Sequence, residues 1–129
     1  MSHFTRVRTR LVDERTLREA LTRMGHEVLS PDGGVHGWRG QKANAAFKVR
    51  PSGTKYEIGF VAKPGCGFTV IADWWGVRVV RQQPFMQRLT REYALAGTIS
   101  TLAAKGFEVQ EQTEKTSGEI RVVLRRVGA

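Results

Sequence analysis

Residues 5–12 read TRVRTRLV, and three arginines occupy every second position of this stretch: Arg6, Arg8 and Arg10. Small or apolar residues, among them Val7 and Leu11, occupy the positions between and after them. Because successive side chains of a strand point to opposite faces, this period of two predicts a strand with one buried and one cationic face. A helix would instead scatter the same arginines round its axis.

The rest of the sequence contains two helical patterns and several strand patterns. One amphipathic helix is expected between an N-cap at Asp13 and a terminating Gly25, and a longer one between Pro84 and Gly106. Strands are expected at 26–29, 45–50, 56–62, 68–72, 107–112 and 119–126. Residues 30–40 are expected to form a loop, and 73–83 form either a strand or a loop.

These patterns predict a single α+β domain over residues 1–129. We expect an antiparallel sheet of about five to seven strands with two helices on one face. The specific expectation is a ferredoxin-like core with an extra hairpin, in which the strands at 45–50, 56–62 and 68–72 form a meander.

The charge balance is strongly basic. Twenty-one Lys and Arg face 12 Asp and Glu, which gives a net charge of +9, and 15 of the cations are arginine. Such a surface attracts nucleic acid, acidic protein faces or anionic lipid, and arginine adds bidentate recognition of phosphate and carboxylate. A base-composition bias that turns surface lysines into arginines is the alternative explanation.

Cysteine usage and hydropathy indicate the compartment. Cys66 is the only cysteine, so an intramolecular disulfide is excluded, as suits a reducing cytosol. The first ten residues lack the apolar region of a secretory signal, and no apolar run approaches the roughly 18 residues of a membrane span. A cytoplasmic protein that does not bind membranes is therefore expected.

A cationic sheet face is the main candidate for a binding surface. If the first and last strands lie in one sheet, their arginines share a face that is open to water. The candidate anion- or partner-binding residues of this face are Arg6, Arg8, Arg10, Lys48, Arg50, Arg121 and Arg125. The alternative is a face that is merely solvated. RNA recognition would need exposed aromatic side chains among the cations, whereas Phe47, Tyr56 and Phe60 share the buried parity.

Three further features are candidates for function. Trp38 and Arg39, in the glycine-rich loop GVHGWRGQK at 34–42, form a candidate partner-binding pair, unless Trp38 folds back over the core. Cys66 and Asp73 are the residues that an enzyme would use, but neither has a clear activating neighbour in the sequence. The histidines and Cys66 lack metal-ligand spacing, so no catalytic residue, metal or cofactor is assigned.

Several stretches together resemble a known family, that of the hypothetical chloroplast open reading frame thirty-five of plastids, cyanobacteria and other bacteria. They are MSHFTRVRTRLVDERTLREALTRMG at the start, GWRGQ at 37–41, YEIGF at 56–60, ADWW at 72–75, and YALAGTISTLAAKGFEV and SGEIRVVLRR towards the end. The resemblance covers nearly the whole chain in the right order. It implies a soluble cytoplasmic or stromal protein with an ATPase of the AAA type as an assembly partner, and it transfers no catalytic residues.

Three functional hypotheses follow. The first is a non-catalytic basic interaction module that docks on an acidic protein partner or an ATPase-containing assembly. The second is a nucleic-acid-binding protein that uses the cationic sheet face for RNA or DNA. The third is a small enzyme that uses Cys66 or Asp73.

Overall fold

The computed structural model describes residues 4–37, 40–77 and 79–127. The chain forms two compact units, Met1–Tyr93 and Ala94–Ala129. Helix α3 (Gln82–Ala104) contributes residues to both units, and each unit is described by itself below.

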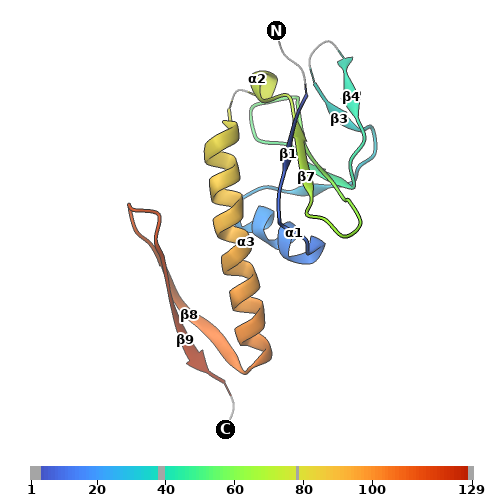
Figure 1. The fold of residues 1–129 in the computed structure, drawn as a ribbon. Coiled ribbons are helices and arrows are strands. Elements are labelled where there is room, and N and C mark those ends of the chain that lie inside the picture. The colour runs from blue at the N-terminus through green and yellow to red at the C-terminus, as the bar shows by residue number, and fades with distance from the viewer. Residues whose placement is uncertain (1–3, 38–39, 78, 128–129) are drawn as a thin grey trace. The chain divides into compact units, whose positions relative to one another are not determined.

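The first unit is built on a five-stranded antiparallel sheet with the order β1-β7-β6-β5-β2 (Figure 1). Its strands are β1 (Thr5–Arg8), β2 (Val28–Leu29), β5 (Phe47–Val49), β6 (Ile58–Val61) and β7 (Thr69–Ala72). The predicted opening strand is confirmed as β1, which pairs with β7. The predicted meander is confirmed as β5, β6 and β7.

The predicted ends of α1 (Glu14–Arg23) and the predicted end of α3 are confirmed, whereas α3 begins at Gln82, two residues before the predicted start at Pro84. In α1, the side chain of Asp13 caps the first turn by accepting a hydrogen bond of 2.9 Å from the backbone N–H of Thr16. Gly25 follows α1 with φ 89° and Gly106 follows α3 with φ 90°, a left-handed conformation that favours glycine. The uncertain segment after β7 forms a short helix, α2 (Trp74–Val77), and not a strand.

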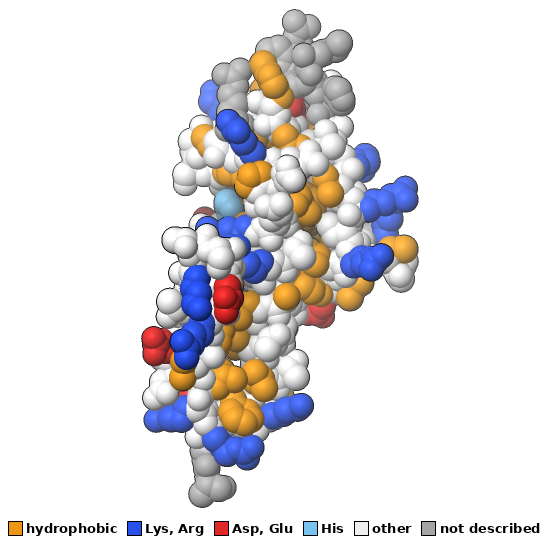
Figure 2. All heavy atoms as spheres, turned by 60° about the vertical axis from the view of Figure 1, so that its left-hand side comes forward, with side chains coloured by type: hydrophobic (Ala, Val, Ile, Leu, Met, Phe, Trp, Pro, Cys, Tyr) orange, Lys and Arg blue, Asp and Glu red, His pale blue; other side chains and the backbone are white. Residues whose placement is uncertain are grey.

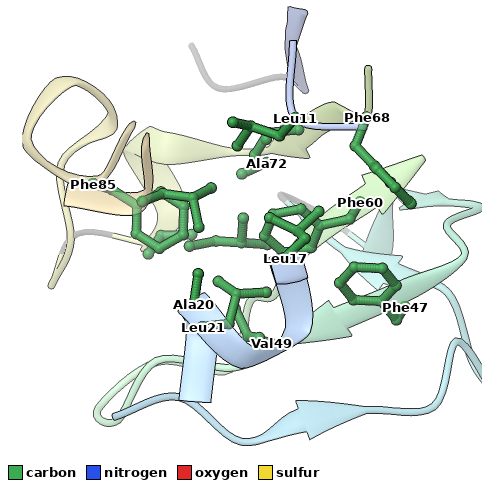
Figure 3. Close-up of a cluster of buried hydrophobic side chains, with 14 residues drawn as sticks. Leu11, Leu17, Ala20, Leu21, Phe47, Val49, Phe60, Phe68, Ala72 and Phe85 are labelled. Carbon is green, nitrogen blue, oxygen red and sulfur yellow. The ribbon is translucent and has the colours of Figure 1, made fainter. Parts of the chain in front are cut away.

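The hydrophobic core lies between one face of the sheet and the two longer helices. The sheet contributes two rows of apolar side chains from β5, β6 and β7: Phe47, Phe60 and Val70, and Val49, Ile58 and Ala72. Leu17 and Leu21 of α1 and Phe85 of α3 pack in the same cluster (Figure 3). The expected arrangement of two helices on one sheet face is therefore confirmed.

The opposite face of this sheet is covered, contrary to the expectation of an open cationic face. The segment expected to be a loop contains β3 (Val35–His36), which pairs with β4 (Lys42–Ala43). Val35 is fully buried, and an ideal Cβ built on Gly59 of β6 would lie only 2.3 Å from its Cγ2 atom. The β3–β4 hairpin therefore packs directly on the backbone of the central strand.

The second unit contains the end of α3 and the closing hairpin of β8 (Phe107–Glu114) and β9 (Ile120–Arg126). The hairpin is confirmed, with an irregularity in register between Val109 and Glu111. It forms its own two-stranded sheet and does not join the five-stranded one. The α+β class is therefore confirmed, but the topology differs from a ferredoxin-like one, because β7 and not the last strand lies beside β1.

The contact between Gly59 and Val35 gives a stability prediction. We expect Gly59→Ala to lower the free energy of unfolding by roughly 2 kcal/mol, because the new methyl group overpacks a filled site. Val35→Ala alone should also be destabilising. In the double variant it should relieve the clash, so the two changes should cost less together than the sum of their separate costs, with a coupling free energy of about 1 kcal/mol or more. Urea unfolding of the four proteins measures this cycle, and additive effects would contradict the packing described here.

Candidate functional site

The three arginines of the opening stretch are exposed. Arg6 and Arg8 lie on β1, at the edge of the sheet, and Arg10 follows two residues after the strand ends. Their partners across the strand pair are uncharged: Arg6 lies opposite Ile71 and Arg8 opposite Thr69. In the part of the chain that the structure describes, none of the three arginines forms an ion pair. They are therefore solvated cations, as expected for the outward face of the predicted strand, and their role in binding stays a prediction.

Two hydrogen bonds keep the chain beside β7 past the end of β1. The hydroxyl of Thr9 donates to the carbonyl of Phe68 at 2.7 Å. The backbone N–H of Phe68 donates to the carbonyl of Leu11 at 2.8 Å. Arg10 is therefore held on the same sheet edge as the two arginines of β1.

Lys48 does not belong to a cationic surface, and that prediction is wrong. Its side chain is buried, with Nζ donating to the carbonyls of Asp32 at 2.9 Å and Gly34 at 2.7 Å. Nζ also lies 3.8 Å from Oε2 of Glu57. The reason is the β3–β4 hairpin, whose entry loop covers this face and needs a donor for its carbonyls.

Arg121 and Arg125 do not share a sheet with the β1 cations, because β9 pairs with β8 in a separate sheet. Arg125 forms an ion pair with Glu108, which lies opposite it on β8. Figure 2 shows acidic side chains beside Lys and Arg on the face that it presents. The continuous patch expected from a shared sheet is therefore absent from the described strands.

The excess of positive charge belongs mainly to the first unit. Residues 1–93 contain 16 Lys and Arg against eight Asp and Glu, a difference of +8, whereas residues 94–129 contain five against four, a difference of +1. The net positive charge that attracts anions therefore lies almost entirely in the first unit.

The structure describes some of the remaining sequence candidates and not others. Trp38 and Arg39 lie outside the described residues. Asp73 is buried, and its Oδ1 accepts a hydrogen bond of 3.1 Å from the backbone N–H of Gly76, which assigns it the role of a cap for α2. Of the two adjacent tryptophans, Trp74 packs on the core beside Phe85, and Trp75 is 54 % exposed. Neighbouring residues point in different directions, so only one of the two side chains reaches the core.

Cys66 is exposed in the turn between β6 and β7, where its N–H donates to the carbonyl of Lys63. It lines a shallow pocket of about 440 Å³ with Lys63 and Phe68. No group of three or more His, Cys, Asp or Glu residues that could hold a metal ion occurs among residues 4–37, 40–77 and 79–127. Over the same residues, no helix has the length and apolar character needed to cross a membrane.

The strongest constellation of polar groups is centred on Glu57, which the sequence interpretation missed. Its carboxylate is fully buried between β5 and the β3–β4 hairpin. Arg50 donates to Oε2 from Nη2 at 2.6 Å and from Nε at 3.2 Å. Burial raises the pKa of Glu57, but the hydrogen bonds from Arg50 and His36 and the charge of Lys48 outweigh burial, so the pKa is lower than usual.

His36 completes this cluster from the other side. Its backbone N–H donates to Oε1 of Glu57 at 2.8 Å, and its Nδ1 lies 2.7 Å from the same oxygen. An ionised carboxylate only accepts hydrogen bonds, so Nδ1 carries a proton and Nε2 is the ring nitrogen that is not bound to Glu57. A pocket of about 320 Å³ opens beside the cluster, lined by His36, Arg50, Thr54 and Lys55.

A sequence signal for this cluster exists. Val49 pairs with Ile58, so the next residues towards the turn, Arg50 and Glu57, lie opposite each other on one face of the hairpin. Opposite charges in such cross-strand positions attract. The strand pattern alone cannot show that this pair lies beneath another hairpin, because charged residues on an alternating strand normally face water.

Because the partners of Glu57 stabilise its ionised carboxylate, the free energy of unfolding should depend on pH. Because the pKa of this carboxyl is lower in the folded chain than in the unfolded one, its contribution is fully present above the unfolded value and is lost as the pH falls through the folded value. We expect Glu57→Gln to cost roughly 3 kcal/mol at pH 7, since it leaves the buried Lys48 and the half-buried Arg50 without their carboxylate.

Urea unfolding at pH 7 and in acid measures this effect. The difference between wild type and Glu57→Gln should shrink in acid, where the wild-type carboxyl is also protonated. The exposed Glu14, which pairs with Arg18 on α1, provides the control, and Glu14→Gln should cost no more than about 0.5 kcal/mol. A difference for Glu57→Gln that is independent of pH would contradict the role of its charge.

Comparisons with known proteins give the family. An uncharacterized protein ycf35 of Guillardia theta is 30 % identical over 133 residues, and one of Cyanophora paradoxa is 29 % identical over 128 residues, with 98 % of each chain covered in both cases. These relatives confirm the resemblance to the hypothetical chloroplast open reading frame thirty-five family. No solved structure matches the chain. A family match covers residues 20–123, and the chain therefore belongs to the family described as Protein of unknown function (DUF1257).

Proposed function

We propose that the protein is a non-catalytic interaction module that docks on an acidic protein partner through β1 and the segment that follows it. The docking residues are Arg6, Arg8 and Arg10. The observation that supports this proposal is that all three are exposed, lie along one sheet edge, and lack an ion pair with any described residue. The candidate partners include an ATPase-containing assembly, and the proposed location is the cytoplasm.

The edge position of β1 suits a protein partner. In the sheet order, β1 has a neighbour on one side only, so its outer N–H and C=O groups can pair with an extended segment. Guanidinium groups beside that edge attract carboxylates and orient them through bidentate hydrogen bonds. An acidic segment would therefore satisfy both the backbone edge and the side chains.

The position of the aromatic rings favours a protein over a nucleic acid. Binding of single strands relies on exposed aromatic side chains that stack on bases. Phe47 and Phe60 are fully buried, with their ring centroids 5.0 Å apart beneath the helices. The arginines of β1 therefore have no stacking partners from these rings, and nucleic acid becomes an outcome to be tested.

A triple variant, Arg6→Glu/Arg8→Glu/Arg10→Glu, tests the proposal. Affinity purification of the tagged chain from its native host at about 50 and 200 mM salt, with and without nuclease, should recover an acidic protein whose binding weakens as salt rises. The variant should weaken the reconstituted complex at least about 10-fold, since like charges then face each other across the interface.

A matched control reverses three other exposed cations, as Lys42→Glu/Arg81→Glu/Arg88→Glu, and gives the same change in net charge. It should bind the partner within about 3-fold of wild type, because its three cations belong to β4, α3 and the residue before α3, and not to β1 or the segment that follows β1. Equal losses in the two triple variants would show that only net charge matters. Recovery that nuclease abolishes would replace the protein partner by a nucleic acid.

A further inference from the structure

The pocket beside Glu57 is separate from the β1 edge and has its own chemistry. It is lined by His36 of β3, by Arg50 directly after β5, and by Thr54 and Lys55 in the connection from β5 to β6. Its volume of about 320 Å³ is at the small end of the range for ligand pockets. The lining groups thus come from two different hairpins and face one space.

The local charge of this pocket is positive. Glu57 is the only acid in the cluster, and it is surrounded by Arg50, Lys48 and the Nδ1 proton of His36. Lys55 adds a further exposed cation at the rim. Because one buried carboxylate faces two buried or half-buried cations and Lys55, the pocket retains an excess of positive charge that attracts an anion.

The buried carboxylate also fixes the donors before any ligand arrives. Arg50 is bound to Glu57 through Nε and Nη2, so its remaining guanidinium protons are held in place. The contact of Nδ1 with Oε1 fixes the ring of His36 and leaves Nε2 available. Groups held in advance lose little conformational freedom on binding, which strengthens even a small contact.

We propose that this pocket binds a phosphate group. Arg50, Lys55 and the hydroxyl of Thr54 are donors for phosphate oxygens, and the ring of His36 lines the same pocket. The phosphate is either the free ion or a monoester on a larger molecule. This proposal does not depend on Arg6, Arg8 or Arg10.

Titration of the full-length chain with sodium phosphate at pH 7, followed by NMR of the histidine ring nitrogens and by calorimetry, tests the site. We expect saturable shifts at His36 and about 5-fold weaker binding in Lys55→Ala, which removes an exposed cation without disturbing Glu57. Lys63→Ala, which removes an exposed lysine from the other pocket, is the matched control and should bind like the wild type.

A parallel titration with phosphoserine distinguishes the two sources of the phosphate group. Tighter binding of phosphoserine than of the free ion identifies a phosphorylated molecule as the source, and the reverse identifies free phosphate. The proposal is overturned by shifts at His36 that do not saturate for either phosphate, or by equal losses in Lys55→Ala and Lys63→Ala. Binding through surface charge alone would give those equal losses in the two lysine variants.

Discussion

The first unit depends on the compensation of one buried carboxylate. Removing the charge of Glu57 from water costs several kcal/mol, and the structure offsets that cost only where donors converge on its two oxygens. The donors are Arg50 after β5 and both the backbone and the ring of His36 on β3. Because the donors lie on different hairpins, satisfying the carboxylate fixes the β3–β4 hairpin over the second face of the sheet. The packing of Val35 on Gly59 then makes that position specific.

The elements of the fold are predictable from sequence because their signals are local. The alternation around Arg6 and Arg8, the N-cap at Asp13 and the glycines after α1 and α3 each act within a few residues, and each is found in the structure. The pairing of the last strand is not predictable in this way. Its alternating apolar residues fit any sheet, and only long-range packing determines that β9 pairs with β8 alone. The cover on the second sheet face has the same origin, since two-residue strands such as β3 have almost no pattern of their own.

The candidate site shows how charge counts can mislead. Lys48, Arg50 and Arg125 are cations by sequence, yet each is engaged by carbonyls or carboxylates of the chain itself. A lysine or arginine on an alternating strand has the same pattern whether it faces water or a buried acid, so periodicity identifies its face and not its partner. The arginines on and after β1 differ because the strand pair beside them offers only uncharged residues. Net charge alone therefore does not identify the cations that are free to meet an anion, whereas register shows which side chains lie opposite them.

Two groups of cations with different physical behaviour remain. Those on the β1 edge are solvated, so salt screens them over about 10 Å at 0.1 M and they favour a large partner that brings many opposing charges. At the pocket, Arg50 is held by a carboxylate that water does not reach, so its remaining donors have fixed positions that suit a single small anion. The excess of positive charge thus favours long-range attraction at the β1 edge and short-range attraction at the pocket beside Glu57. The buried Glu57 makes the difference, because it holds its cations in fixed positions that the arginines of β1 lack.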